Sequence, residues 1–286
     1  MNPVTIGIIG GTGGMGRLFR ELFEKAGHRV LIAGRQTELS YLELTRKSDI
    51  VILSTPVDAA IQICEIIGPI MTEDQALMDF CSLKEDIVAA MLKGTTKAEV
   101  VGTHPLFGPF TRSLSCHHII LCPGRGDKWR RWIEGEFNKM GAETQDMAAD
   151  LHDRNMAVVQ GLTHLLTICT GRTLQKINMT PDAAMACSTP IFKLTIDLIG
   201  RLFAQDLELY SMLVGKNKYV PEVVDTFIQA LTEGQTALLK GDPEEGMRFL
   251  GEIKTFLGAF CEEGLKQSNR YINHVIHRNR EDTPFS

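Results

Sequence analysis

The sequence lacks any uninterrupted apolar segment that approaches the roughly 20 residues needed to cross a membrane. Its first apolar run, residues 6–9, is far too short for a signal peptide and is followed at once by glycines. Runs of basic residues are also lacking, apart from a locally basic stretch at 125–131, and the formal net charge is −5. These features weigh against a membrane or a nucleic acid as the main partner, and we expect a cytoplasmic protein.

Paired cysteine motifs are lacking as well. The seven cysteines are scattered, no two are spaced as in CxxC, and their number is odd. Neither a zinc site nor a disulfide framework is therefore indicated, and we expect no metal. The favoured interpretation is that these thiols are small apolar core residues in a reducing compartment. An activated cysteine nucleophile has no positive support.

The first half of the chain alternates short apolar runs with helical patterns. The apolar runs lie at 5–9, 29–33, 50–53, 76–79, 99–101 and 118–121, and amphipathic stretches lie at 17–25, 59–67, 84–92 and 129–140. Continuous apolar strands indicate a mostly parallel sheet that is covered on both faces. This is the doubly wound, Rossmann-like α/β pattern, and we assign residues 1–146 to it.

After about residue 147 only helical patterns follow, at 149–174, 190–203, 221–239 and 243–267. Thr180 and Asp242 each precede a proline and an acidic residue, which is the signature of a helix start. We therefore expect 147–286 to form an all-α C-terminal domain. Its helices are apolar around much of their circumference, which a homodimer interface and an ordinary bundle core would explain equally well.

A glycine-rich segment, GGTGGMG at 10–16, follows the first expected strand. Gly11, Gly13 and Gly16 fit G-x-G-x-x-G, in which the glycines serve the tight turn, the approach of the pyrophosphate and the packing of helix on strand, in that order. Helix N-termini favour phosphate groups. We therefore expect the segment to bind a dinucleotide through Gly11, Thr12, Gly13, Gly14, Met15 and Gly16.

The end of the second expected strand bears on which dinucleotide is bound. Enzymes that use NAD usually place an acid there for the ribose 2′-hydroxyl, whereas this chain has Arg35 and no acid at the strand tip. An arginine fork can pair with a 2′-phosphate, so NADP is favoured over NAD. The alternative is that Arg35 is a solvated surface residue. Ser54, Thr55 and Pro56 follow the third strand and are expected to line the cofactor.

A candidate catalytic residue follows the fifth expected strand. His104 stands on what we predict to be a rigid turn, bracketed by Gly102 and Pro105 at the carboxyl edge of the sheet. Such a position would bring its side chain to the nicotinamide ring. By itself, a His-Pro turn reflects packing more often than catalysis.

Six stretches together resemble the prephenate dehydrogenase family, especially its short, single-function bacterial and archaeal forms. They lie at 8–16, 79–84, 104–109, 160–164, 188–193 and 199–206, and so extend over nearly the full chain. The first is shared with many dinucleotide enzymes, whereas the combination and order of the others are specific. The resemblance implies an NAD(P)-dependent oxidative decarboxylation of prephenate to 4-hydroxyphenylpyruvate, a step of tyrosine biosynthesis.

The resemblance also implies roles for individual residues. His104 is expected to accept the proton of the substrate hydroxyl, and Ser82 to help hold His104 or that hydroxyl. Because the substrate is a dianion, Arg201 is expected to grip a carboxylate. Lys193 replaces the arginine of some relatives, so the charge is kept without the fork geometry. The expected substrate contacts are completed by His164, Lys193, Gln205 and Lys84.

Other functions stay open at this point. Arogenate, which has an amino acid side chain instead of a keto acid, is an alternative substrate. Another NADP-linked dehydrogenase of the β-hydroxyacid type would need a catalytic lysine motif that neither Lys176 nor Lys193 matches. A regulator that binds NADP without turnover would have no need of His104 and Arg201.

Overall fold

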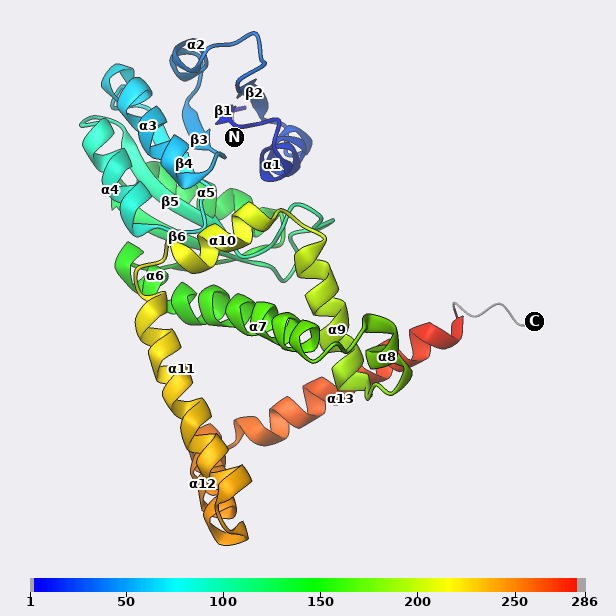
Figure 1. Ribbon diagram of the computed structural model, residues 1–286. Helices are drawn as coiled ribbons and strands as arrows, with labels where there is room; N and C mark the ends of the chain where they lie inside the picture. The colour runs from blue at the N-terminus through cyan, green and yellow to red at the C-terminus, as the bar shows by residue number, and fades with distance from the viewer. Residues whose placement is uncertain (1–2, 282–286) are drawn as a thin grey trace. The chain divides into compact units, whose positions relative to one another are not determined.

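The computed structural model describes residues 3–281, and the chain divides into two compact units, Met1–Met156 and Ala157–Ser286 (Figure 1). The first unit is a sheet with helices on both faces and the second is helical, which confirms the expected fold class. The division falls ten residues after the boundary expected at 146, because helix α6 (Ala149–Met156) contacts helix α4 (Glu85–Gly94) and strand β6 (His118–Arg125) of the first unit.

The sheet has seven strands in the order β2-β1-β3-β4-β5-β6-β7. All neighbouring strands run parallel except β5 and β6, which are antiparallel. Strand β7 was not predicted, because its short sequence ETQD is polar and mostly exposed at the sheet edge. Besides β6, the strands are β1 (Thr5–Ile9), β2 (Arg29–Ala33), β3 (Ile50–Leu53), β4 (Ala76–Asp79), β5 (Glu99–Pro105) and β7 (Glu143–Asp146).

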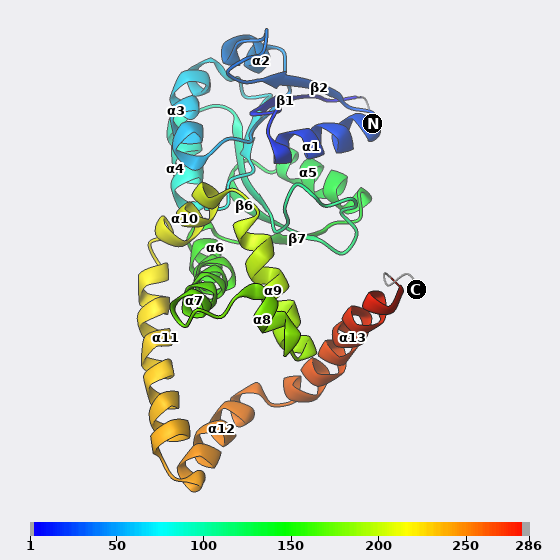
Figure 2. The ribbon, with the colours of Figure 1, turned by 45° about the vertical axis from the view of Figure 1, so that its right-hand side comes forward.

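Two apolar clusters lie on the two faces of the sheet. Helices α1 (Gly14–Lys25) and α5 (Lys128–Lys139) cover one face, where Phe19, Phe23 and Phe137 pack over Ile6 and Ile8. Helices α2 (Tyr41–Arg46), α3 (Val57–Ile67) and α4 cover the other face (Figure 2). Successive residues of the central strands β1, β3 and β4 are therefore buried on both faces of the sheet, which is why these strands are nearly continuous apolar runs in the sequence.

The second unit begins with a π-helical segment (Ala157–Leu162) and continues through a series of helices. These are α7 (Thr163–Lys176), α8 (Pro181–Ala186), α9 (Pro190–Phe203), α10 (Leu207–Gly215), α11 (Val220–Gln235), the π segment Thr236–Lys240, α12 (Pro243–Leu257) and α13 (Phe260–Glu281). The two predicted helix starts are confirmed, since Thr180 and Asp242 accept backbone N–H groups of their first turns. The expected helix at 243–267 is interrupted at Gly258, which has φ +53°.

Large apolar side chains remain exposed on the helices of the second unit. Leu239 is 77% exposed, Phe256 88% and Met247 70%, although such residues normally avoid water. This distribution agrees with the circumferential apolar pattern of the sequence. None of the helices within the described residues is both long and apolar enough to span a membrane.

Candidate active site

The glycine-rich segment connects β1 to α1 and has no space for side chains at several positions. Gly10 adopts φ +86°, and a Cβ added to it would overlap the carbonyl group of Ser54. A Cβ on Gly16 would overlap the carbonyl oxygen of Gly10, so α1 packs directly on the loop. The tight turn therefore lies at Gly10 and not, as predicted, at Gly11. The missing side chain of Gly11 instead makes room for Ile32 of β2.

The N-terminus of α1 is suited to an anion. The helix begins at Gly14 with Gly13 as its N-cap, and its first turn contains no acidic residue. Thr12, Gly13 and Gly14 are exposed. The backbone N–H of Gly13 donates to the carbonyl oxygen of Gly10 at 2.9 Å, so the donors left for an anion are those of the first helical turn, from Gly14 onward. Unpaired N–H groups and the helix dipole both favour a phosphate at such a position. The segment thus fits the pyrophosphate of a dinucleotide.

The loop that follows β5 lies against this glycine segment. A Cβ on Gly14 would lie 2.9 Å from the Cβ of Pro109, which is five residues beyond His104. Real Cβ atoms essentially never approach another heavy atom so closely, so a side chain at position 14 would displace Pro109. Gly14 therefore permits the chain segment that carries His104 to lie beside the expected phosphate site.

The loop after β3 contains an unusual buried hydroxyl. The Oγ1 atom of Thr55 is buried and has no hydrogen-bond partner among the described residues. Buried polar groups nearly always have a partner, so the natural reading is that a bound ligand supplies it. A Cβ on Gly10 would lie 2.9 Å from the Cγ2 of Thr55, which places this loop of Ser54, Thr55 and Pro56 beside the glycine turn. The geometry fits its predicted place beside a cofactor.

Arg35 lies on a short turn directly after β2. The backbone N–H of Gly34 donates to the Oγ1 of Thr37 at 2.8 Å, and a Cβ on Gly34 would lie 3.6 Å from the Oγ1 of Thr12. The turn therefore adjoins the glycine segment. Arg35 is exposed and forms no hydrogen bond or ion pair with any described residue, so its guanidinium donors point to solvent or ligand. This arrangement fits a cofactor ribose or a 2′-phosphate.

His104 lies within strand β5, which corrects the prediction that it stands on a turn. The strand extends to Pro105, because His104 pairs with Ile120 and Pro105 with Ile119 of the antiparallel strand β6. The predicted strand ended at residue 101, because a proline is unfavourable inside a strand. In the structure Pro105 is the last residue of β5, where a proline is tolerated. The side chain of His104 is buried, with 2% of the residue exposed.

A hydrogen-bond chain that the sequence analysis missed holds His104. Its Nδ1 lies 2.8 Å from the Nε2 of His152, and the Nδ1 of His152 lies 2.7 Å from the Oδ1 of Asp153. Asp153 also accepts the backbone N–H groups of Lys84 at 2.8 Å and Glu85 at 2.9 Å. The adjacent His-Asp pair within the short helix α6 was the available signal, but the expected boundary at 146 assigned it to the other domain.

Burial and hydrogen bonding set the protonation of these groups. Burial lowers the pKa of His104 well below its usual value, and the neighbouring His152 and the Lys84 ammonium lower it further. For Asp153, burial alone would raise the pKa, but the hydrogen bonds from His152 and from the two backbone N–H groups outweigh it and lower the pKa. His104 is therefore a neutral imidazole and Asp153 a carboxylate near neutral pH.

Lys84 has a different position from the one predicted. Its side chain is fully buried, forms an ion pair with Asp79 and donates to the carbonyl oxygen of Thr103. Asp79 in turn accepts the backbone N–H groups of Cys81 and Thr103. Because the Lys84 ammonium binds Asp79 and Thr103 inside the first unit, the prediction that Lys84 contacts the substrate is wrong. It braces the backbone of β5 next to His104.

Ser82 lies half-buried in the loop between β4 and α4. The hydrogen-bond partner that the structure shows at the Nδ1 of His104 is the Nε2 of His152 and not Ser82. The predicted role of Ser82 toward the substrate hydroxyl stays a prediction.

The predicted substrate residues of the second unit lie on helices α7, α9 and α10, which contact one another. His164 begins α7, packs edge-on against Tyr210 of α10 with ring centroids 4.9 Å apart, and has a pKa lowered by burial. Lys193 and Arg201 are eight residues apart on α9, so they share one face of that helix. Gln205 donates to the backbone carbonyl of Arg201, which places both at the C-terminal end of α9.

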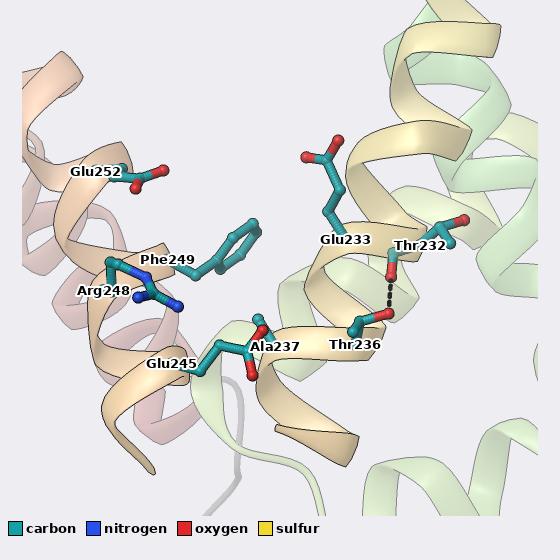
Figure 3. A pocket seen from close by; sticks show the side chains of 8 residues that line it. All are labelled: Thr232, Glu233, Thr236, Ala237, Glu245, Arg248, Phe249 and Glu252. Atoms are coloured by element: carbon teal, nitrogen blue, oxygen red, sulfur yellow. Dashed lines mark hydrogen bonds between the residues drawn. The ribbon is translucent and has the colours of Figure 1, made fainter. Parts of the chain in front are cut away.

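A surface pocket of the second unit lies elsewhere. It is formed by α11, the π segment Thr236–Lys240 and α12, with the aromatic ring of Phe249 between Glu233 and Arg248 (Figure 3). The Thr236 hydroxyl donates to the backbone carbonyl of Thr232, and the Thr232 hydroxyl donates to the backbone carbonyl of Ile228. None of the predicted site residues lines this pocket.

Two family models match the chain. The model described as "Prephenate dehydrogenase, nucleotide-binding domain" matches residues 23–144, and that described as "Prephenate dehydrogenase, dimerization domain" matches residues 148–252. Together they cover most of both units.

Curated relatives and solved structures agree with these matches. A probable arogenate/prephenate dehydrogenase of Methanocaldococcus jannaschii is 31% identical over 94% of this chain, which spans 64% of that protein's length. The T-protein of Haemophilus influenzae is 30% identical over 94% of the chain and 71% of its own length. The crystal structure of prephenate dehydrogenase from A. aeolicus with hydroxyphenyl propionate and NAD+ superposes with a TM-score of 0.71, at 23% identity over 89% of this chain and 97% of that one. The Synechocystis arogenate dehydrogenase structure gives 0.67, at 18% identity over 88% and 98%.

Proposed function

Because this chain belongs to the prephenate dehydrogenase family, we propose that it catalyses the oxidative decarboxylation of prephenate to 4-hydroxyphenylpyruvate with NADP. The observation that carries the proposal is His104, a buried neutral imidazole. It lies five residues before Pro109, which contacts the glycine segment that fits a dinucleotide. Arogenate is the second candidate substrate, and one of the similar structures is an arogenate dehydrogenase.

The chemistry needs one base. A hydride leaves C4 of the substrate, the C4 hydroxyl proton passes to His104, and the C1 carboxylate leaves as carbon dioxide while the ring becomes aromatic. The proton then returns from His104 to the phenolate oxygen, which gives 4-hydroxyphenylpyruvate and restores the base. The nicotinamide cofactor supplies the acceptor for the hydride. Because burial and the neighbouring positive charges keep the pKa of His104 low, its imidazole is in the basic form before the reaction. General base catalysis of this kind is worth roughly 10²–10⁴-fold in rate.

The residues around the glycine segment would hold the cofactor. The N–H groups of the first turn of α1, from Gly14 onward, would bind its pyrophosphate. Thr55 offers a buried hydroxyl without a described partner, and Arg35 offers a planar fork for a 2′-phosphate. An aspartate at position 35 would repel that phosphate. Arg35→Asp should therefore raise KM for NADP at least about tenfold with a much smaller effect on NAD; equal effects on both would contradict the NADP assignment.

The carboxylates of the substrate would be bound by the positive side chains of the second unit. Arg201 is the first candidate, because an arginine fork binds a carboxylate through two hydrogen bonds. Lys193 on the same helix face adds charge, and His164 and Gln205 belong to the same group of helices. Ser82 is proposed to contact the substrate hydroxyl from the first unit.

A direct assay tests the proposal. Purified protein is mixed with prephenate or arogenate in parallel, with NADP or NAD, and the reduced cofactor is followed by its absorbance. We expect turnover of prephenate with NADP. His104→Asn should reduce kcat about 10²–10⁴-fold with little change in substrate KM. Arg201→Ala should instead raise substrate KM about tenfold or more.

Three outcomes of this assay would contradict parts of the proposal. Turnover of arogenate alone would replace the proposed substrate by the second candidate. Wild-type kinetics in both His104→Asn and Arg201→Ala would show that the site has been placed wrongly. Absence of turnover with either substrate and either cofactor would overturn the proposed activity.

We also propose that the protein is a homodimer and that the second unit forms the interface. One family model matched by this unit is described as a dimerization domain. The exposed Leu239, Met247 and Phe256 supply the apolar surface that such an interface buries. Sedimentation at micromolar concentration should give twice the chain mass of 31.7 kDa; a monomer would contradict this assembly.

A further inference from the structure

The chain of hydrogen bonds from Asp153 through His152 to His104 has a direction. A carboxylate can only accept hydrogen bonds, and Asp153 already accepts the backbone N–H groups of Lys84 and Glu85. Since these bonds favour the ionised form of Asp153, the short contact with His152 requires that the Nδ1 of His152 carry the proton. The direction of the first bond is thereby fixed.

The second bond then follows from the first. If His152 carries only this one proton, its Nε2 has a lone pair, and that nitrogen lies 2.8 Å from the Nδ1 of His104. Two lone pairs cannot form a hydrogen bond, so the Nδ1 of His104 must be the donor. The Nε2 of His104 is then the basic nitrogen. Because the ring centroids are 5.0 Å apart and the planes meet at 69°, the rings meet edge to face and not stacked.

We propose that His152 and Asp153 are positioning residues that hold His104 in its Nδ1–H tautomer, so that Nε2 is the nitrogen which accepts the substrate proton. The role in turnover rests on the proposed function, whereas the tautomer itself does not depend on it. The pair also stabilises the imidazolium that forms during the reaction, because the Asp153 carboxylate is joined to it through His152.

The charged groups around His104 support this division of roles. His152 and Asp153 lie on one side, on helix α6, while Lys84 and Asp79 form a separate buried ion pair. The Lys84 ammonium opposes a second positive charge on His104. A carboxylate coupled to the ring through His152 offsets that repulsion at the moment when the proton arrives.

Replacing Asp153 by asparagine reverses the direction of the chain. An asparagine amide can donate to the Nδ1 of His152, which would place the His152 proton on Nε2 and make that nitrogen the donor to His104. The His104 proton would move to Nε2, where it blocks the base. In the serine protease triad the corresponding change lowers kcat about 10⁴-fold with the geometry intact. With a second ring in between, we expect Asp153→Asn to lower kcat at least about 100-fold.

The experiment combines kinetics with nitrogen NMR of the histidine rings in the full-length protein. In wild type, correlation spectra of ¹⁵N-labelled histidine should show His104 as the Nδ1–H tautomer, assigned by the signal that His104→Asn removes. In Asp153→Asn the His104 signal should change to the Nε2–H pattern. The loss of kcat should be accompanied by less than about a threefold change in substrate KM, and by an altered pH profile of kcat/KM.

Two further variants separate positioning from folding. His152→Gln leaves the backbone bonds of Asp153 intact and offers an amide oxygen to the Nδ1 of His104, so it should keep the tautomer and lose less than about tenfold in kcat. His152→Leu offers no acceptor and should lose about as much as Asp153→Asn. Asp127→Asn, a change of an exposed carboxylate that pairs with Arg130, is the control and should leave kcat unchanged.

The outcomes are distinct. A wild-type His104 in the Nε2–H form, or an Asp153→Asn protein that keeps both the tautomer and kcat, would overturn the inference. Equal losses in His152→Gln and His152→Leu would also overturn it, because the acceptor would then be irrelevant. If the spectra change as expected while wild type turns over neither substrate, the proposed function fails and the positioning role stands.

Discussion

The buried ion pair between Lys84 and Asp79 makes a strong prediction about stability. Both side chains are fully shielded from solvent, and the ammonium also donates to the carbonyl oxygen of Thr103. Lys84→Met keeps much of the side-chain volume and removes the charge. The Asp79 carboxylate is then left buried with only the backbone N–H groups of Cys81 and Thr103 as partners.

Breaking a buried pair by removing one partner typically costs about 3–5 kcal/mol. The two remaining N–H donors to Asp79 favour the lower end of that range, about 3 kcal/mol. A domain of this size has a denaturant slope of about 2 kcal/mol per molar urea. Lys84→Met should therefore lower the urea midpoint of the first unit by about 1.5 M. A double variant that also carries Asp79→Asn should lose less than the sum of the two single variants, by at least about 1 kcal/mol.

Tryptophan fluorescence is a suitable assay. The only two tryptophans of the chain, Trp129 and Trp132, both lie on α5, so their emission reports the unfolding of the first unit alone. Arg20→Met is the matched control, because it removes the exposed partner of Glu24 on α1 and should cost less than about 1 kcal/mol. If Lys84→Met shifts the midpoint no more than Arg20→Met does, the buried pair does not stabilise this edge of the sheet.

Two further predictions concern the site. Gly14→Ala should displace Pro109 and raise KM for the cofactor severalfold; unchanged kinetics would show that the contact is not needed. Burial lowers the pKa of His104 in the folded protein. Below the ordinary histidine pKa of about 6.5, this residue therefore binds a proton in the unfolded chain but not in the folded one. The free energy of unfolding of the first unit must then fall as the pH drops through that value. One such group contributes up to about 1.4 kcal/mol per pH unit. Between about pH 6.5 and 5, the unfolding free energy measured with urea should depend on pH less steeply in His104→Asn than in wild type, by up to that amount. Equal pH dependence in the two proteins would contradict a buried neutral ring.

Much of the fold could be predicted because it depends on short-range patterns. The strands β1 to β4 are continuous apolar runs, and the helix starts at Thr180 and Asp242 are formed by neighbouring residues. Strand β7 could not be recognised, because an edge strand made of ETQD has no apolar signal. The last part of β5 was missed because its pairing with β6 outweighs the ordinary effect of Pro105.

The site was predictable to a smaller extent. The glycine segment, Arg35 and His104 could be proposed from the sequence because a motif and the ends of the expected strands indicate them. Lys84 was assigned to the substrate, whereas its ammonium bonds to Asp79 inside the first unit. Lysines are usually exposed, so a sequence pattern predicts an exposed charge at position 84. Only the structure shows that the side chain is buried against a carboxylate.

The sequence by itself determined the dinucleotide loop and most of the strands and helices, because each of these depends on residues that are close together in the chain. It also determined the family, through six motifs and their order along the chain. The tertiary structure decided which groups surround His104. His152 and Asp153 approach from 48 and 49 residues further along the chain, and Asp153 binds the backbone of a loop 68 residues away. Such bonds depend on how α6 packs beside the sheet, and the direction of their protons follows only once their distances are known.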